Sequence, residues 1–371
     1  MAGHAAMSGR AKSNKPVSLP LFTPAAIDPA ELDTHTVGRA ALLSRLTDRI
    51  TGAVRDGSRP HTLLIGPRGS GKTHTLHVMV HHALADHAAA KNMLPLILPE
   101  DSLAIGNYGD LLVELVRPYR PDARELRNDV IGLERGILDL ADGRMILMAV
   151  ENLDRVFEAI GEAGQGSLRA WVETSTAVML FATAPALFPA VASRTHPWYG
   201  SFIVEELADL TADEGAEIVA RAGDDELAAY LRSPEGQNRI AAINRLVGGS
   251  PRLWHMVADS VDVPALQALE PVVAALLDRL APSYQQRLWQ LPTGEQRLVV
   301  ELARGEGPRT VSDLAAAVGV SNQTASAALG RLAAGRWVVG TKSDEGDRRV
   351  TWYDLSDPML RRVVQYRDGR V

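Results

Sequence analysis

The chain has 371 residues, of which 46% are hydrophobic and 23% are charged, and its formal net charge at pH 7 is −6. This length favours two or three domains, and the charge argues against a protein that coats nucleic acid indiscriminately. The sequence contains no cysteine, which excludes disulfides, thiolate zinc sites and a cysteine nucleophile. It shows neither an apolar run of membrane-spanning length nor a signal peptide, so we expect a cytoplasmic protein that does not contact a membrane.

The charge is not spread evenly along the chain. Residues 282–371 contain 13 Lys and Arg against 10 Asp and Glu, so this part carries +3 and the remainder carries −9. A mildly basic C-terminal part behind an acidic body is compatible with a polyanionic partner at that end.

The N-terminal sequence changes character at residue 21. Residues 1–20 have no hydrophobic periodicity and predict a disordered, slightly basic tail. Residues 37–39 read Val-Gly-Arg and precede a predicted amphipathic helix. The apolar side of that helix consists of Leu42, Leu43, Leu46 and Ile50.

A phosphate-binding motif follows this helix. Residues 61–65 read as a buried strand and residues 73–90 as a helix. The eight residues that join them fit the Walker A pattern of Gly, four residues, Gly, Lys and then Ser or Thr. The glycines let the loop turn its N–H groups toward phosphates, the lysine reaches the β- and γ-phosphates, and the last hydroxyl ligates Mg²⁺. The motif consists of Gly66, Pro67, Arg68, Gly69, Ser70, Gly71, Lys72 and Thr73.

Apolar runs of strand length alternate with predicted helices after this motif. The runs lie at residues 94–98, 145–150, 177–182 and 201–204, and helices are predicted at 108–116 and 125–141. The alternation predicts an α/β fold with a parallel sheet that helices cover on both faces. We assign residues 21–210 to a domain that contains this sheet and the Walker A motif and that we expect to bind ATP.

The run at residues 145–150 ends in polar side chains. Acids at the carboxyl end of a parallel strand lie in the ligand crevice, beside the phosphates of a P-loop fold. We therefore expect the Walker B segment at Glu151, Asn152, Leu153 and Asp154.

The remaining sequence predicts a helical part followed by a mixed one. Residues 211–281 show only helical periodicity and would form a lid over the nucleotide. In residues 282–371, helices at 295–303, 311–318 and 321–334 precede two strands around a polar hairpin. This order predicts a winged helix-turn-helix, whose third helix enters the major groove of DNA while the wing contacts the backbone or minor groove.

The combined pattern resembles AAA+ and signal-transducing P-loop ATPases of the origin-recognition initiator and archaeal-ATPase type. The resemblance rests on the Walker A motif, the helical lid and the C-terminal winged helix, and it covers residues 21–371. It implies that the chain binds ATP or ADP with Mg²⁺, and Thr73 and Glu151 are the expected metal ligands. It also implies a homo-oligomer or a partner protein that completes the ATP site.

The resemblance assigns roles to further positions. Thr183 stands at the place of the polar sensor 1 residue, and Arg252, after Gly249-Ser250-Pro251, stands at the place of sensor 2. Arg194 is the candidate for the arginine that reaches the γ-phosphate of a neighbouring subunit, although a solvated surface arginine would explain it equally well. The positions where such ATPases contact the adenine are Val37, Gly38 and Arg39.

The Walker B segment departs from the family's usual Asp-Glu pair, in which Asp holds Mg²⁺ and Glu positions the attacking water. If Glu151 replaces the metal-side Asp, Asn152 stands at the position of the base, and an amide cannot accept a proton from water. Alternatively, Glu151 itself is the base, and Asp154 or water completes the Mg²⁺ shell. We therefore expect weak or partner-stimulated ATP hydrolysis.

The predicted winged helix offers candidate DNA contacts. Asn and Gln suit the reading of adenine edges, and the polar residues early in the third helix are Asn322, Gln323, Thr324 and Ser326. The residues that could hold phosphates are Arg331, Lys342, Arg348 and Arg349. Against DNA, the wing also carries Asp344, Glu345 and Asp347, and winged helices also dock proteins. The two hypotheses are an ATP-controlled DNA-binding switch or loader and a nucleotide-binding regulatory scaffold.

Histidines recur at helical spacing in the helix after the Walker A motif. They are His74, His77 and His81, and no carboxylate lies among them. We interpret them as packing or surface residues rather than as metal ligands.

Overall fold

The computed structural model describes residues 27–98, 100, 105–342 and 350–369. The predicted tail at residues 1–20 lies outside the described residues. The described chain forms two compact units, the first made of residues 27–222 and 249–255, and the second of residues 223–248 and 256–369. No helix in the described ranges combines the length and the apolar character that crossing a membrane requires.

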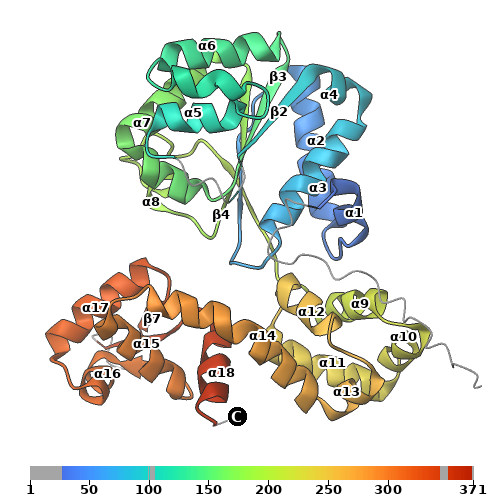
Figure 1. Cartoon of the computed structure of the whole chain (residues 1–371), viewed down its shortest axis with the longest axis vertical. Coiled ribbons are helices and arrows are strands. Elements are labelled where there is room, and N and C mark those ends of the chain that lie inside the picture. The colour runs from blue at the N-terminus through green and yellow to red at the C-terminus, as the bar shows by residue number, and fades with distance from the viewer. Residues whose placement is uncertain (1–26, 99, 101–104, 343–349, 370–371) are drawn as a thin grey trace, which may run out of the picture. The chain divides into compact units, whose positions relative to one another are not determined.

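The first unit contains a five-stranded sheet in which all strands are parallel (Figure 1). The strand order is β2-β3-β4-β1-β5. The predicted parallel sheet is therefore confirmed, with β1 and β4 adjacent at its centre. The strands are β1 (Thr62–Ile65), β2 (Met93–Leu98), β3 (Met145–Val150), β4 (Val178–Ala184) and β5 (Ile203–Glu206).

Helices cover both faces of this sheet, as Figure 1 shows. One face carries α2 (Ala40–Asp56), α3 (Lys72–Ala85) and α4 (His87–Asn92), and α1 (Pro29–Thr34) packs on α3. The other face carries α5 (Tyr108–Val116), α6 (Val130–Ala141), α7 (Leu153–Ser175) and α8 (Pro189–Ala192), together with the short 3-10 helix η2 (Pro121–Leu126). The unit also includes α9 (Ala212–Ala222) and the start of α12 (Pro251–Ala258).

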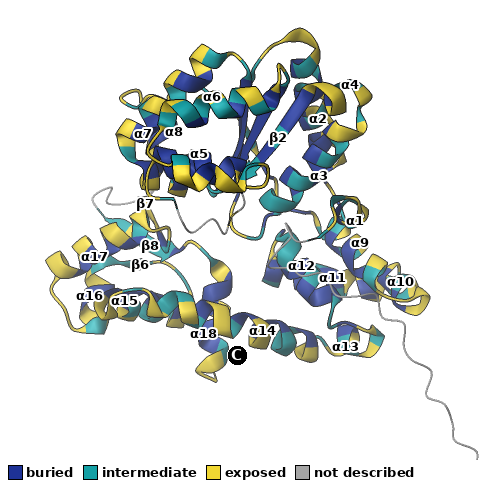
Figure 2. Ribbon diagram, turned by 45° about the horizontal axis from the view of Figure 1, so that its top comes forward, coloured by how far each residue is buried: buried dark blue, intermediate teal, exposed yellow. Residues whose placement is uncertain are grey.

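Two hydrophobic cores lie on opposite sides of the sheet. Successive side chains of a strand point to opposite faces, so Leu63 joins the core of α5 and α7, while Leu64 joins the core of α2 and α3. Figure 2 shows the sheet in the buried colour and exposed residues on the outer sides of the helices. Strands β3 and β4 are buried along their whole length, which explains their continuous apolar sequence.

Two predicted helices are divided in the structure. The helix predicted at residues 73–90 ends at Ala85, because Asp86 leaves the helical conformation and its side chain caps α4 by accepting a hydrogen bond from the Ala89 N–H. The helix predicted at residues 125–141 begins only at Val130, where the Asp129 side chain accepts from the Gly132 N–H. Aspartate caps of this kind end one helix or start another.

The second unit contains helices from the predicted lid together with the winged helix. The helices of the predicted lid that belong to this unit include α10 (Asp225–Leu231), α11 (Pro234–Val247), α13 (Val263–Ala268) and most of α14 (Glu270–Trp289). Helix α14 also packs against α18, the last helix of the chain. The winged part consists of α15 (Thr293–Arg304), β6 (Arg309–Thr310), α16 (Val311–Val318), α17 (Asn322–Ala334), β7 (Val338–Lys342), β8 (Thr351–Leu355) and α18 (Pro358–Arg367).

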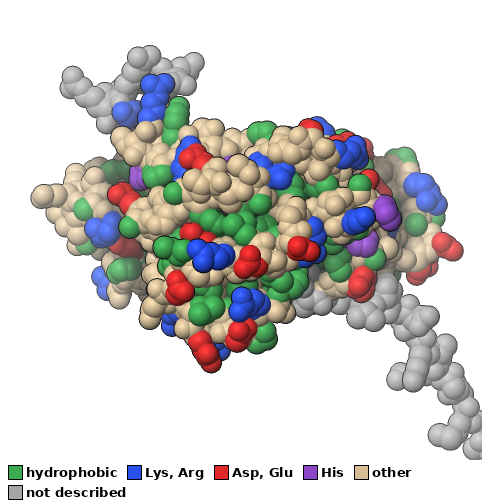
Figure 3. Space-filling model, turned by 90° about the horizontal axis from the view of Figure 1, so that it is seen from above, with side chains coloured by type: hydrophobic (Ala, Val, Ile, Leu, Met, Phe, Trp, Pro, Cys, Tyr) green, Lys and Arg blue, Asp and Glu red, His purple; other side chains and the backbone are tan. Residues whose placement is uncertain are grey.

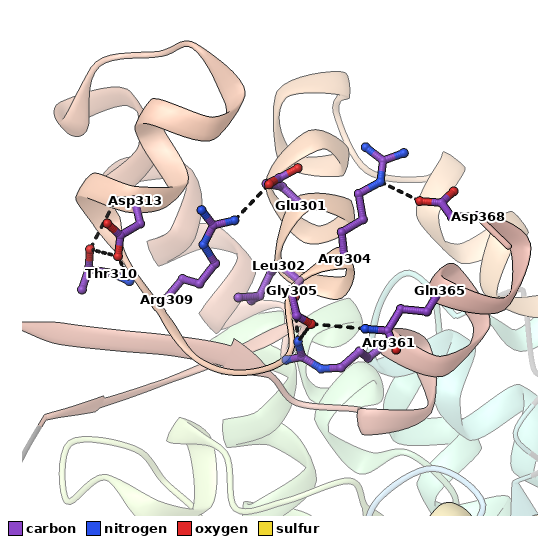
Figure 4. A network of polar contacts seen from close by, with 10 residues as sticks. All are labelled: Glu301, Leu302, Arg304, Gly305, Arg309, Thr310, Asp313, Arg361, Gln365 and Asp368. Atoms are coloured by element: carbon purple, nitrogen blue, oxygen red, sulfur yellow. Dashed lines mark hydrogen bonds and ion pairs between the residues drawn. The ribbon is translucent and has the colours of Figure 1, made fainter. Parts of the chain in front are cut away.

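The winged helix-turn-helix is confirmed, and its sheet has one strand more than predicted. The order is β6-β8-β7, and both pairings are antiparallel. A network of polar contacts holds α18 against α15 (Figure 4). Arg361 is only 8% exposed and donates to the carbonyl oxygens of Leu302, at 3.0 Å, and Gly305, while it also pairs with Asp354.

Candidate functional site

The Walker A loop lies between the end of β1 and the start of α3, as the motif predicts. Gly69 and Gly71 have φ values of 86° and 95°, in the left-handed region that glycine adopts without strain. The Lys72 ammonium group is turned onto the loop itself, where Nζ donates to the carbonyl oxygens of Gly66, at 2.9 Å, and Pro67, at 3.1 Å. The lysine is thus held within the loop that is predicted to bind phosphates.

The negative charges of nearby carboxylates act on the Lys72 ammonium group. Burial lowers the pKa of Lys72 below its ordinary value, and the charges of Glu100, Asp154 and Glu151 oppose that shift. Glu151 and Asp154 follow β3, whereas Lys72 follows β1. The fold therefore brings the Walker A lysine and the predicted Walker B acids together at the carboxyl edge of the sheet.

The two predicted metal ligands are in direct contact. The Thr73 hydroxyl donates to Oε2 of Glu151, a residue only 3% exposed. The other carboxylate oxygen of Glu151, Oε1, lies 3.9 Å from Nε2 of His77. Sequence reasoning did not select His77 as a site residue, although its position one helical turn after Thr73 places both on the same face of α3.

Asn152 has a backbone role that the sequence pattern did not predict. Its φ and ψ angles are 49° and 55°, in the left-handed region, and it occupies the N-cap position of α7 without a capping hydrogen bond from its side chain. Its backbone N–H donates to the Thr183 hydroxyl oxygen at 3.1 Å. Asn is one of the few residues besides Gly that adopts this conformation readily. Position 152 therefore suits Asn for its conformation, and Thr183 is joined to the Walker B turn.

Two buried polar atoms around the loop show that the site suits a phosphate group and a metal ion. Oγ of Ser70 and Oδ1 of Asp154 are buried and have no hydrogen-bond partner among the described residues. A Cβ atom at Gly66 would lie only 2.7 Å from Oγ of Ser70. Hydroxyl and carboxylate oxygens are the ligands that Mg²⁺ prefers, and an ammonium group suits phosphate oxygens. The donor set therefore fits Mg²⁺ and a nucleotide.

The predicted adenine-contacting residues line a cavity of about 600 Å³. Arg39 is 8% exposed, and its Nη2 has no hydrogen-bond partner among the described residues. Burial lowers the pKa of this guanidinium group, while Glu214 and Asp209 raise it. The described lining does not include the Walker A loop; it consists of Asp33, Thr36, Val37, Gly38, Arg39, Ala40, Leu43, Ser44, Thr47, Asp48, His82, Glu217 and Arg221.

The predicted sensor 2 segment contacts the Walker A loop. The backbone N–H of Arg252 donates to the Gly69 carbonyl oxygen at 3.3 Å, and the Ser250 hydroxyl donates to the same oxygen at 3.4 Å. Ser250 was not selected from the sequence. Arg194 lies on an exposed turn after α8, and within the described ranges no hydrogen bond or ion pair joins it to the other candidate residues.

The histidines after Walker A are packing residues or lie near the site. His74 is joined to the Thr36 hydroxyl by a hydrogen bond of 2.7 Å between Nε2 and Oγ1. Across the described ranges, no cluster of three or more His, Asp or Glu side chains has the arrangement of a metal site. The structure therefore assigns His74 a hydrogen bond between α3 and the segment that precedes Val37.

The candidate DNA contacts lie on the surface of the winged helix. Lys342 is exposed at the end of β7, whereas Nε of Arg331 pairs with Oε1 of the buried Glu295 at 2.7 Å. Arg348 and Arg349, and the acidic wing residues near them, lie outside the described residues. The exposed uncharged polar residues of α17 are Asn322, Gln323, Thr324 and Ser326.

The surface shown in Figure 3 carries both signs of charge. Basic and acidic side chains are interspersed there with apolar ones. A mixed surface of this kind produces no strong field for a polyanion on the face that the figure shows.

Comparison with known proteins gives one family match and several similar solved structures. Residues 289–349 match the model of the MarR family. No curated protein matches the sequence. The ORC2 protein of Aeropyrum pernix, solved with ADPNP and ADP, aligns over 90% of this chain and 95% of its own, with a TM-score of 0.61 and 14% identity.

Two further solved structures share the architecture. The Walker-type ATPase of Pyrococcus abyssi aligns over 89% of this chain and 96% of its own, with a TM-score of 0.58 and 16% identity. The ORC1 protein of Aeropyrum pernix, solved in complex with DNA, aligns over 90% of this chain and 93% of its own, with a TM-score of 0.54 and 15% identity. These likenesses confirm the predicted fold class, an AAA+-like module followed by a winged helix.

Proposed function

We propose that this chain is an ATP-binding switch or loader that binds duplex DNA through its winged helix and hydrolyses ATP slowly or with the help of a partner. One observation carries the proposal: Lys72, Thr73, Glu151 and Asp154 meet at the carboxyl edge of the parallel sheet. A loop built to bind phosphates lies beside them. We propose that the protein acts in the cytoplasm.

Nucleotide binding would replace contacts that the Walker A loop makes within itself in this structure. Lys72 would exchange the carbonyl oxygens of Gly66 and Pro67 for phosphate oxygens, which are stronger acceptors for an ammonium group. Thr73 and Glu151 would hold Mg²⁺, and Val37, Gly38 and Arg39 would contact the base. Bound Mg²⁺ neutralises charge on the phosphates during hydrolysis.

Slow hydrolysis follows from the residues at the Walker B turn. The Asn152 amide cannot accept a proton from water, and its backbone is committed to the left-handed turn. Asp154 has a buried carboxylate oxygen without a partner among the described residues and is the remaining group that could position water. Arg194, on its exposed turn, would complete the ATP site of a second copy in a homo-oligomer.

DNA binding is supported by the fold of the second unit and by the MarR family match at residues 289–349. A similar protein of Aeropyrum pernix was solved with DNA. A regulatory scaffold that docks a protein is the second candidate, and one observation favours it. Trp289, the last residue of α14, is 68% exposed, and large exposed aromatic side chains are common in protein interfaces.

Nucleotide binding is tested by thermal unfolding with and without ATP and Mg²⁺. A ligand that binds only the native state raises the melting temperature. We expect this rise for the wild-type protein and for Lys91→Ala, whose side chain is exposed on α4, and no rise for Lys72→Ala. An equal rise for Lys72→Ala would refute the assigned site.

DNA binding is tested by fluorescence anisotropy of a labelled duplex at low salt, where phosphate contacts are strongest. We expect binding whose affinity differs between ATP and ADP, and a Lys72→Ala protein that no longer responds to the nucleotide. A wild-type protein that binds no duplex in either state would favour the scaffold. Size measurements with and without ATP test the expected assembly.

A further inference from the structure

The third helix of the winged helix presents an uncharged polar face. Asn322, Gln323 and Ser326 are exposed, whereas Ala325 and Leu329 are buried against the rest of the domain. With 3.6 residues per turn, Gln323, Ala327 and Gly330 fall on the side of α17 opposite the buried residues. That side is the one available to a DNA groove.

The residues that read guanine are missing from this face. Residues 321–330 contain neither Lys nor Arg, and Arg and Lys are the side chains that bind guanine O6 and N7. The first cation on α17 is Arg331, whose Nε is held by Glu295 at 2.7 Å. Glu295 belongs to α15 and is only 7% exposed. The Nε atom of Arg331 is therefore held by α15, and the two outer nitrogens of its guanidinium group are not part of this contact.

The remaining exposed side chains suit A·T base pairs. Asn and Gln bind adenine N6 and N7 through two hydrogen bonds, and an Ala methyl group can contact the methyl group of thymine. Gly330 has no neighbouring atom within 4 Å of the position of a Cβ, so that part of the helix is open to a close approach. The Gln323 amide and the small residues Ala327 and Gly330 thus share one exposed helix face.

We infer that α17 reads A·T base pairs in the major groove, with Gln323 as the residue that determines specificity. This inference rests on the proposed DNA-binding function and names its substrate class. Lys342 and the outer nitrogens of Arg331 would contact phosphates and would contribute affinity without sequence preference. The bases are therefore distinguished by hydrogen bonds and methyl contacts, and not by charge.

The inference is tested with the full-length protein by selection from a random duplex library at low salt. The dissociation constants are then measured for the selected site and for versions in which single A·T pairs become G·C. We expect A·T pairs in the selected site and a loss of about tenfold in affinity at the pair that Gln323 reads. Gln323→Ala should remove this preference, and Gln323→Arg should transfer it to G·C at the same pair.

Controls separate specificity from affinity and from folding. Lys342→Ala should weaken binding to all duplexes by a similar factor, without changing the preference. Gln323 is exposed, and circular dichroism checks that its variants fold. A selected site of G·C pairs, or an unchanged preference in Gln323→Ala, overturns this inference but leaves DNA binding intact. Failure of the wild-type protein to bind any duplex at low salt overturns the proposed DNA function as well.

Discussion

The backbone N–H of Arg252 donates a hydrogen bond to the Gly69 carbonyl oxygen, 3.3 Å away, and so joins the start of α12 to the Walker A loop. The Ser250 hydroxyl donates to the same oxygen. The contact depends on glycine at position 69, since a Cβ there would lie 3.2 Å from Oγ of Ser250 and 3.3 Å from Cβ of Arg252. The loop that is proposed to bind phosphates is therefore also a packing surface for α12.

Gly69→Ala should consequently impair nucleotide binding. The substitution places a side chain at φ 86°, which costs about 1 kcal/mol or more of stability, and it pushes against Ser250 and Arg252. Gly57→Ala is the matched control, because φ is 76° there but no atom lies within 4 Å of the new Cβ. We expect both variants to lose stability in chemical denaturation. Only Gly69→Ala should lose the ATP-dependent rise in melting temperature, and an equal loss in both would contradict the assigned contact.

Substitutions at the Walker B turn should separate conformation from chemistry. Asn152→Gly keeps the left-handed backbone and should change the free energy of unfolding little, whereas Asn152→Glu should lower it by about 1 kcal/mol. If Asp154 positions water, Asp154→Asn should abolish the residual phosphate release that Asn152→Gly retains. Steady-state phosphate release measures this difference. Equal rates in wild type and Asp154→Asn would exclude the role proposed for Asp154.

The first unit should lose stability as the pH falls from 6.5 toward 4. Burial, with Arg169 adding to it, lowers the pKa of His61 to about 4, and burial, followed by the nearby His255 and His35, lowers the pKa of His74 to about 4. Between pH 6.5 and 4 the unfolded chain therefore binds protons that the folded chain does not, so the free energy of unfolding decreases as the pH decreases. Each group should contribute on the order of 2 kcal/mol.

Denaturant unfolding at a series of pH values measures this loss. His61→Asn preserves an acceptor for the Leu180 N–H, which lies 3.1 Å from Nδ1 of His61, and His74→Gln preserves a partner for Thr36. Both variants should show a smaller loss of stability between pH 6.5 and 4. His87→Gln, at an exposed position, is the control and should follow the wild-type profile. Variants with an unchanged profile would show that other groups cause the pH dependence.

Arg361→Ala should destabilise the second unit by about 3 kcal/mol, because it leaves the carbonyl oxygens of Leu302 and Gly305 and the carboxylate of Asp354 without their donor. The adjacent Arg362 is exposed, and Arg362→Ala should change stability by less than about 0.5 kcal/mol. Chemical denaturation of the two variants measures the difference. Similar free energies of unfolding would contradict the anchoring role of Arg361.

The sequence predicted most of the sheet because its strands are buried. The run at residues 145–150 corresponds to β3 residue for residue, since a strand covered on both faces must be apolar throughout. Helix α7 was not predicted. Its 23 residues include Gly161, which has a non-helical φ of 66°, and such an interruption obscures helical periodicity.

The residues that the sequence predicts for Walker A and Walker B lie near one another in the structure, but the sequence did not predict the contacts around them. The bond between Arg252 and Gly69 involves main-chain atoms from distant parts of the chain, and side-chain patterns carry no signal for such a bond. The left-handed conformation of Asn152 was missed for a related reason. Comparison with the usual Asp-Glu pair shows only that Asn152 replaces an acid, and it carries no information on the backbone conformation of Asn152. The spacing of Thr73 and His77 would have been detectable from helical periodicity.

Helix α14 contacts two different parts of the second unit. It has 20 residues and is therefore about 30 Å long, and it packs against α13 near one end and against α18 of the winged helix. Hydrogen bonding between Tyr284 and Asp357, at 2.6 Å, secures the second contact. Within the second unit, α14 therefore connects a helix of the predicted lid to the last helix of the winged part.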